Sequence, residues 1–147
     1  MKRLFISFNS SKCAGCFACV VGCQEKQNHV IGSVSFRQVI TRELEISQSI
    51  MLKSLSIACR NCKDAHCLNE CPSGAIFRQA ETGIVDVNRD LCIVCQNCKS
   101  ACPFDIPRFD ADGKMIKCNL CQDHIVIDKL PACVAVCPTK SLTLHST

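Results

Sequence analysis

Sixteen cysteines occur in this chain of 147 residues, and they fall into four motifs of four with none left over. In chain order, motifs one to four are Cys13-x2-Cys16-x2-Cys19-x3-Cys23, Cys59-x2-Cys62-x4-Cys67-x3-Cys71, Cys92-x2-Cys95-x2-Cys98-x3-Cys102 and Cys118-x2-Cys121-x11-Cys133-x3-Cys137. A proline follows each of the last three motifs. Cysteines with this spacing ligate iron–sulfur clusters, and four quartets suffice for four 4Fe–4S clusters. The pattern therefore predicts single-electron transfer through clusters.

Zinc and disulfide bonds are the alternatives to iron–sulfur ligation. Four cysteines can hold structural zinc, but zinc ribbons present them as two well-separated pairs. Motifs one and three instead place three cysteines within seven residues, with the fourth four positions later, as in bacterial ferredoxins. A disulfide framework requires export, and the chain turns polar too soon after Met1 to form the apolar region of a signal peptide. We therefore expect a reducing, cytoplasmic location.

The formal charge of +4 counts every cysteine as neutral. Four oxidised clusters with thiolate ligands would contribute about −8, which leaves the loaded protein near −4. A basic surface for nucleic acid is therefore not expected. No run approaches the 18 apolar residues of a membrane span, so we expect no direct insertion into a membrane.

The residues around the motifs predict an α+β fold of short strands and one-turn helices. Short β-type runs precede the motifs or follow the Cys-Pro pairs, at residues 4–8, 55–58, 75–77, 84–87, 115–116 and 141–144. The x3 step between third and fourth cysteines fits one helical turn with both thiols on one side. The proline after the fourth cysteine ends that turn, since the residue before proline is pushed to extended geometry.

In two-cluster ferredoxins the fourth cysteine of a motif ligates the other cluster, so the motifs must work in pairs. Only twenty residues, enough for one hairpin, separate Cys71 from Cys92. We therefore expect two interleaved ferredoxin-like units: an inner one over 58–112 with motifs two and three, and an outer one over 1–57 plus 113–147 with motifs one and four. Sequential pairing is the alternative, but 35 residues separate Cys23 from Cys59.

The segment 33–57 inside the outer unit predicts a β-hairpin. Val34, Phe36 and Ile40 partly alternate with polar residues, residues 50–57 are again rich in apolar side chains, and Ser47-Gln48-Ser49 lies between them. The hairpin either covers the clusters or forms a docking surface.

The histidines and lysines beside the cysteines can each be interpreted in two ways. His66 and His124 could replace a ligand, but every quartet is complete, so they are expected at the surface or behind the ligands; His29 and His145 carry no signal. Four lysines next to ligands, Lys12, Lys63, Lys99 and Lys117, could raise cluster potentials or could simply be solvated. No catalytic motif occurs, so the chain is not expected to be an enzyme on its own.

Several blocks that together span nearly the whole chain resemble one family. They are Cys13-Ala-Gly-Cys-Phe-Ala-Cys-Val-Val-Gly-Cys23 with Asn28, Cys59-Arg-Asn-Cys-Lys-Asp-Ala-His-Cys-Leu-Asn-Glu-Cys-Pro-Ser-Gly-Ala75, Cys102-Pro-Phe-Asp-Ile-Pro-Arg-Phe109, Lys117-Cys-Asn-Leu-Cys121 and Pro131-Ala-Cys-Val-Ala-Val-Cys-Pro-Thr-Lys140. The chain resembles the four-cluster iron–sulfur subunits associated with DMSO reductase, formate dehydrogenase and related molybdenum or tungsten enzymes, and with some hydrogenases. Compared with larger relatives, we expect this chain to lack the insertions and the C-terminal extension that they use against membrane subunits.

The resemblance implies four ligand sets. They are cluster A on Cys13, Cys16, Cys19 and Cys137; cluster B on Cys118, Cys121, Cys133 and Cys23; cluster C on Cys59, Cys62, Cys67 and Cys102; and cluster D on Cys92, Cys95, Cys98 and Cys71. It also implies a relay of electrons between a molybdopterin- or tungstopterin-type catalytic subunit, or a hydrogenase, and a further redox subunit. A freely diffusing polyferredoxin and a filament-forming conducting module are the alternatives.

Overall fold

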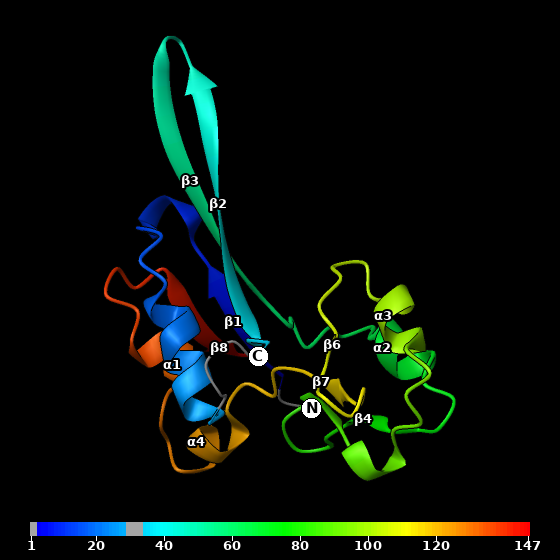
Figure 1. The fold of residues 1–147 in the computed structure, drawn as a ribbon. Helices are drawn as coiled ribbons and strands as arrows, with labels where there is room; N and C mark the ends of the chain where they lie inside the picture. The colour runs from blue at the N-terminus through cyan, green and yellow to red at the C-terminus, as the bar shows by residue number, and fades with distance from the viewer. Residues whose placement is uncertain (1–2, 29–33) are drawn as a thin grey trace. The chain divides into compact units, whose positions relative to one another are not determined.

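A computed structural model describes residues 3–28 and 34–147 of the chain (Figure 1). His29 and Ser33, the first residue of the predicted hairpin segment, lie outside these described residues. The elements are β1 (Leu4–Phe8), η1 (Ser10–Lys12), α1 (Ala18–Lys26), β2 (Arg37–Ile46), β3 (Ser49–Ala58), α2 (His66–Asn69), β4 (Ile76–Arg78), β5 (Val85–Val87), η2 (Arg89–Leu91), α3 (Asn97–Ala101), β6 (Arg108–Phe109), β7 (Met115–Ile116), α4 (Gln122–Val126), α5 (Ala132–Ala135) and β8 (Leu142–Ser146). Short strands and short helices make the fold α+β, as predicted.

The chain forms two compact units. Unit 1 contains Met1–Phe5, Cys59–Leu120 and His145–Thr147, and unit 2 contains Ile6–Ala58 and Cys121–Leu144. Residues 59–112 of the predicted inner unit therefore lie in unit 1, which also includes residues 113–120. No helix among the residues that the structure describes is long and apolar enough to cross a lipid bilayer.

The approach to motif one repeats the approach to motif three. Asn9 directly follows β1, and Asn88 directly follows β5. Each asparagine side chain accepts a hydrogen bond of 3.0 Å from the backbone amide two residues later. Each thereby caps a short 3-10 helix that runs into the first cysteine of its motif. An asparagine cap and a short 3-10 helix thus position both Cys13 and Cys92.

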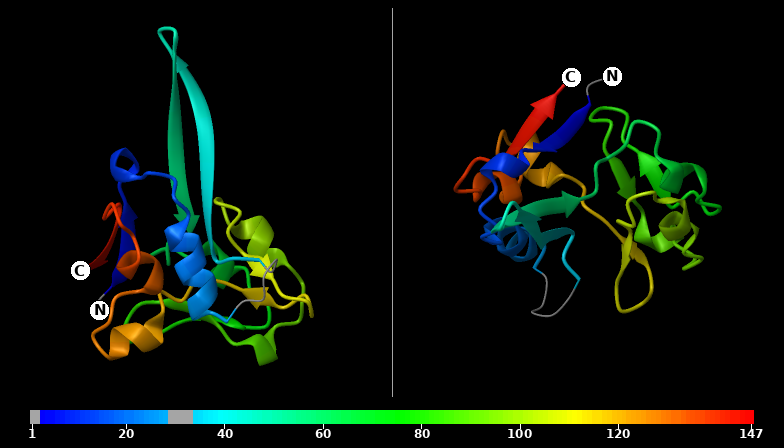
Figure 2. Two further views of the ribbon diagram at one scale, coloured as in Figure 1. Left: turned by 60° about the vertical axis from the view of Figure 1, so that its left-hand side comes forward. Right: turned by 90° about the horizontal axis from the view of Figure 1, so that it is seen from above.

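The strand that leads into one motif pairs with the strand that follows another. β1 pairs with β8, and Figure 2 shows them side by side in both views, while β4 and β5 form an antiparallel pair. The two pairs end alike, because Asn9 donates its backbone N–H to Ser141 at 2.8 Å and Asn88 donates to Ala75 at 2.8 Å. Strand pairing therefore links motif one to motif four in the same way as it links motif three to motif two.

The helices that carry the third cysteines repeat the same relationship. α1 packs against α5 in unit 2, and α2 packs against α3 in unit 1. In unit 2 the close approach depends on Gly22, since a Cβ atom there would lie 2.8 Å from Val136 Cγ2. Cys19 and Cys133 accordingly share one small core with Val134 and Leu142.

The predicted hairpin is present as β2 and β3, paired antiparallel from Arg37↔Ala58 to Ile46↔Ser49. Its turn residues, Ser47 and Gln48, both have positive φ angles, of 47° and 68°, as a two-residue hairpin turn that matches the strand twist requires. Figure 1 shows this ribbon extending beyond the helices of its own unit.

Candidate iron–sulfur sites

The four cysteine loops share one left-handed backbone position although their sequences differ. The residue before the second cysteine is in the left-handed region in every motif: Gly15 (φ 65°), Asn61 (46°), Val94 (61°) and Leu120 (60°). For a β-branched residue such as Val94 this conformation is a genuine outlier, and such strain concentrates at binding sites. Turns of this kind direct successive backbone amides into a concavity that suits an anion, including an iron–sulfur cluster.

The three Cys-Pro segments form a second repeated turn. The third residue after the cysteine is left-handed in each case, at Gly74 (φ 65°), Asp105 (48°) and Lys140 (52°). Its amide donates back to the carbonyl of the cysteine at 3.2, 3.1 and 3.3 Å, respectively. The chain therefore reverses directly behind the fourth cysteine of motifs two, three and four.

These turns surround two of the thiols with hydrogen-bond donors. Burial raises the pKa of Cys137, but the Ser141 and Thr139 hydroxyls and the backbone amides of Leu142 and Ser141 outweigh it and bring the pKa to about 6. Burial likewise raises the pKa of Cys71, and the amides of Ile76, Ala75 and Ser73 with the Ser73 hydroxyl reverse the effect, so that its pKa is lowered. Both sites stabilise a thiolate, which is the form that ligates iron.

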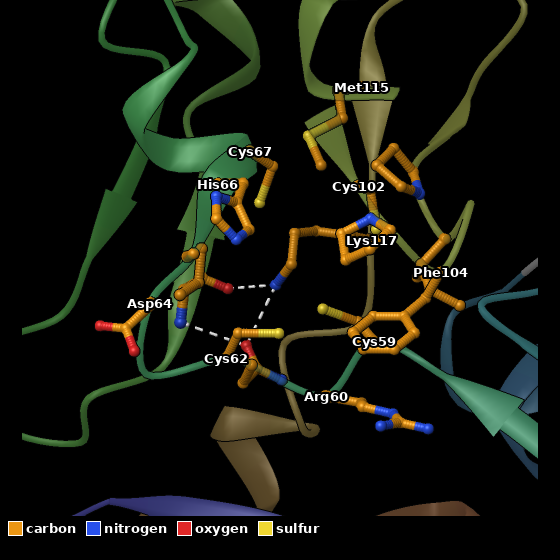
Figure 3. Close-up of a pocket in the computed structure, with 16 residues that line it drawn as sticks. Cys59, Arg60, Cys62, Asp64, His66, Cys67, Cys102, Phe104, Met115 and Lys117 are labelled. Carbon is orange, nitrogen blue, oxygen red and sulfur yellow. Dashed lines mark hydrogen bonds between the residues drawn. The ribbon is translucent and has the colours of Figure 1, made fainter. Parts of the chain in front are cut away.

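A cavity in unit 1 is lined by the four cysteines predicted for cluster C. Cys59, Cys62, Cys67 and Cys102 surround about 480 Å³ of space, part of it open to solvent, and Figure 3 shows them with Phe104 and Met115. Burial is the main cause of the raised pKa of Cys62, and the charges of Cys59 and Cys102 raise it further. Four thiolates this close repel one another unless a positive centre lies among them.

A second cavity of unit 1 is lined by the four cysteines predicted for cluster D. Cys71, Cys92, Cys95 and Cys98 surround about 320 Å³. Burial, followed by the charges of Cys67 and Cys95, raises the pKa of Cys98 to about 11. Cys71 of motif two thus joins three cysteines of motif three, while Cys102 of motif three joins three of motif two.

Unit 2 holds all four cysteines predicted for cluster A and three of those predicted for cluster B; Cys118 belongs to unit 1. Burial is the main cause of the raised pKa of Cys133, and the charges of Cys121 and Cys19 contribute to the rise. Lys26 at the end of α1 forms a 2.5 Å ion pair with Asp123 of α4. The two motifs of this unit are therefore held together by packing and by charge.

Among the described residues, each unit buries one cation beside its cysteines. Lys117 is 6% exposed and lines the cavity of Cys59, Cys62, Cys67 and Cys102, whereas Lys12, Lys63 and Lys99 are exposed. Its ammonium donates to Asn61 Oδ1 at 3.2 Å, to the Cys118 carbonyl at 2.8 Å and to the Val85 carbonyl. The second hydrogen-bonding atom of Asn61, Nδ2, is buried and has no partner among the described residues, which leaves a donor beside the cavity for a cluster sulfur.

The cation of unit 2 is Arg37, which is 4% exposed. Its guanidinium donates to Ser56 Oγ at 2.9 Å, and its charge and hydrogen bond act on Cys133, where they oppose the rise in pKa that burial causes. Sequence patterns did not single out Arg37, because it lies in the hairpin, far along the chain from any cysteine. Its place beside apolar strand residues was the only available signal.

His66 and His124 lie apart from these groups of thiols or at their edge. His66 is exposed at the rim of the first cavity, and His124 Nδ1 lies 3.1 Å from the Leu130 carbonyl oxygen. Within residues 3–28 and 34–147, no three His, Cys, Asp or Glu side chains are grouped so that they could hold a single metal ion.

The model of the 4Fe-4S dicluster domain family matches residues 50–147, two thirds of the chain. The protein belongs to this family. As the cysteine spacing predicted, 4Fe–4S clusters are therefore the cofactors of this chain, and the cysteine-lined cavities and stabilised thiolates fit that cofactor.

The chain is also similar along most of its length to several other proteins. Over 138 residues it is 41% identical to "Protein NrfC" of Escherichia coli strain K12, a match that covers 92% of this chain and 61% of the relative. It is 36% identical over 143 residues to the B subunit of the anaerobic dimethyl sulfoxide reductase of Shigella flexneri, covering 91% of this chain and 69% of that one. The B subunit of the Haemophilus influenzae reductase is 33% identical over 153 residues, covering 97% and 73%. This chain thus spans about three fifths of the length of NrfC.

Proposed function

We propose that this protein relays single electrons through four 4Fe–4S clusters between a catalytic oxidoreductase subunit and another redox subunit. The observation that carries the proposal is the crossed arrangement in unit 1, where each of two cavities takes three cysteines from one motif and one from the other. This is the arrangement of a two-cluster ferredoxin. It places two clusters side by side, as a relay requires.

In this proposal cluster C is held by Cys59, Cys62, Cys67 and Cys102, and cluster D by Cys92, Cys95, Cys98 and Cys71. The correspondence between β1–β8 and β4–β5 supports the same exchange between motifs one and four, with cluster A on Cys13, Cys16, Cys19 and Cys137. Cluster B then takes Cys118, Cys121, Cys133 and Cys23. In this assignment motifs two and three form the inner ferredoxin-like unit, and motifs one and four form the outer one.

The bound clusters supply the one-electron chemistry, and the protein sets their spacing, hydration and electrostatic surroundings. Backbone amides donate to Cys71 and Cys137, and buried Lys117 and Arg37 place positive charge beside the cysteines. The chain carries out no substrate chemistry of its own.

The partner assignment draws on the relatives, two of which are named as B subunits of an anaerobic dimethyl sulfoxide reductase. We propose a catalytic subunit of the molybdopterin or tungstopterin type and a cytoplasmic location. A free polyferredoxin and a self-assembled filament are the competing assemblies. Purification of the tagged chain from its own cells separates them: a stable large partner supports the subunit, whereas a lone monomer or high-mass rods of this chain alone contradict it.

Cluster number is tested by iron and acid-labile sulfide analysis after anaerobic reconstitution, with electron paramagnetic resonance (EPR) of the reduced protein. We expect iron and sulfide for four 4Fe–4S clusters per chain, with interacting spins. Zinc in place of iron, or fewer than three clusters per chain, would overturn the proposal.

A further inference from the structure

The β2–β3 hairpin has two faces, because alternate residues of a strand point to opposite sides. The inner face includes Arg37, Thr41, Ser54 and Ser56, and its half nearest the helices packs against motif one. Cys19 Sγ lies 3.5 Å from Ser56 Oγ, and a Cβ atom at Gly15 would come within 2.5 Å of Ser54 Oγ. This half of the inner face therefore supports the loop that carries the motif-one cysteines.

The outer face presents a row of aliphatic side chains to solvent. Its members, by register, are the pair Ile40↔Leu55, the pair Leu44↔Met51, and Ile46; they are 37–52% exposed. A two-stranded ribbon gains little stability by itself in water, and clustered exposed aliphatic residues commonly mark an interaction site.

Two cations interrupt this row. Arg42 and Lys53 are directly opposite each other in the register, so their side chains share the outer face. Both are exposed, and neither forms an ion pair within the described part of the chain. Like charges directly opposite on a sheet destabilise it, and a carboxylate between them would remove that cost.

We propose that the outer face docks against another polypeptide of the electron-transfer complex, one that presents apolar side chains around a carboxylate positioned between Arg42 and Lys53. This inference rests on the proposed function. It assigns the hairpin, which no cluster ligand occupies, to partner recognition. Since the inner face supports the motif-one loop, the docked polypeptide would be separated from that loop by the thickness of one ribbon.

A second copy of this chain fits the outer face poorly. Packing two outer faces together would gather both Arg42–Lys53 pairs in one interface, which charge repulsion opposes. Packing an outer face on an inner face would bring the cations to Glu43 and Glu45, which lie on the inner side. However, the half of the inner face beside Ser54 and Ser56 is already covered by motif one. The second copy would therefore leave Ile40 and Leu55 of the outer face exposed to solvent.

The contact is tested on the cluster-loaded complex purified through a tag on this chain. A carbodiimide forms an amide directly between an amine and a carboxylate that touch, with loss of water to the reagent. We expect mass spectrometry to find Lys53 joined to an Asp or Glu of a second polypeptide. Lys53 joined only to carboxylates of this chain, in the same or another copy, would overturn the proposal, as would an unlinked Lys53 while other lysines react.

Matched double variants test the apolar part. Leu44→Ser with Met51→Ser alters the outer face, and Ile50→Ser with Leu52→Ser removes two aliphatic residues, more exposed still, from the inner face near the turn. We expect the outer variant to lower the amount of co-purified polypeptide by roughly tenfold, and the inner variant to retain it. Equal retention or equal loss in the two variants would overturn the assignment to this face.

Iron, sulfide and EPR measurements on both variants keep the two proposals apart. A chain that fails to take up clusters contradicts the proposed function. A fully loaded chain whose outer variant keeps its partner, or which binds no second polypeptide in any form, contradicts the docking inference while cluster ligation stands.

Discussion

The ammonium of Lys117 donates a hydrogen bond to Asn61 Oδ1 across 3.2 Å at the edge of a cavity lined by four cysteines. Asn61 Oδ1 also accepts from the Val85 amide at 3.1 Å, so the amide group is fixed in orientation by two donors. The lysine is held by oxygen atoms of neutral groups, and no carboxylate neutralises it in this set of contacts. A buried positive charge is thereby fixed beside the proposed cluster C.

Replacing Lys117 by Met is expected to lower the reduction potential of one cluster. Reduction adds negative charge, which a neighbouring cation stabilises. The loss should be on the order of 60 mV, the one-electron equivalent of about 1.4 kcal/mol. A potentiometric titration followed by EPR measures it.

Lys63→Met is the control for this change, since Lys63 also neighbours a ligand but is exposed to solvent. Its effect should be several-fold smaller, because water screens an exposed charge. Equal shifts in the two variants, or no shift in Lys117→Met, would contradict a role of burial in setting the potential.

Exchange of the fourth cysteines predicts which variants share a phenotype. Cys62→Ser and Cys102→Ser should perturb the same EPR signal, although the residues belong to different motifs, because both line one cavity. Cys98→Ser and Cys71→Ser should perturb a different signal, since both line the other. If Cys102→Ser instead matches Cys98→Ser, each motif would ligate its own cluster and the interleaved arrangement would be wrong.

Alanine substitutions at two glycines with the same φ angle distinguish the cost of backbone strain from the cost of a steric contact. Gly15 and Gly74 both have φ of 65°, but a Cβ atom would meet Ser54 Oγ at 2.5 Å in the first and nothing within 4 Å in the second. Gly74→Ala should cost about 1–2 kcal/mol for the left-handed backbone. Gly15→Ala should cost about 0.5–1.5 kcal/mol more, because the Ser54 hydroxyl must turn away and give up its 2.9 Å hydrogen bond with Thr41.

The measurement is the guanidinium midpoint for loss of cluster absorbance under anaerobic conditions. Ser54→Gly removes the contacting hydroxyl. Added to Gly15→Ala, it should restore part of the lost stability, whereas added to Gly74→Ala it should restore none. Identical behaviour of the two alanine variants would show that the contact with the hairpin does not matter.

Gly22 and Val136 should be energetically coupled. A Cβ atom at Gly22 would lie 2.8 Å from Val136 Cγ2, so Gly22→Ala is expected to destabilise unit 2 by about 1–3 kcal/mol through overpacking of α1 and α5. Val136→Ala frees that space and costs little alone, since Val136 is 44% exposed. A double-mutant cycle should therefore give a favourable interaction free energy of at least about 0.5 kcal/mol; additive effects would refute the coupling.

Local sequence patterns predicted most elements because they act over a few residues. The β-type runs at 4–8, 84–87 and 141–144 became β1, β5 and β8, and the x3 steps became short helices. The hairpin was also confirmed, including its turn at Ser47 and Gln48. Left-handed Val94 and Leu120 could not have been foreseen, since intrinsic preference opposes that conformation and only the closed loop imposes it.

By itself the sequence determined the cofactor class and the grouping of sixteen cysteines into four motifs, because ligand spacing is a property of short segments. It could not rank four lysines that all adjoin cysteines, nor single out Arg37. Only the tertiary structure decided that Lys117 and Arg37 are buried while Lys12, Lys63 and Lys99 stay in water. The physical reason is that the strength of a charge depends on the dielectric around it, and that environment is built by segments far apart in the chain.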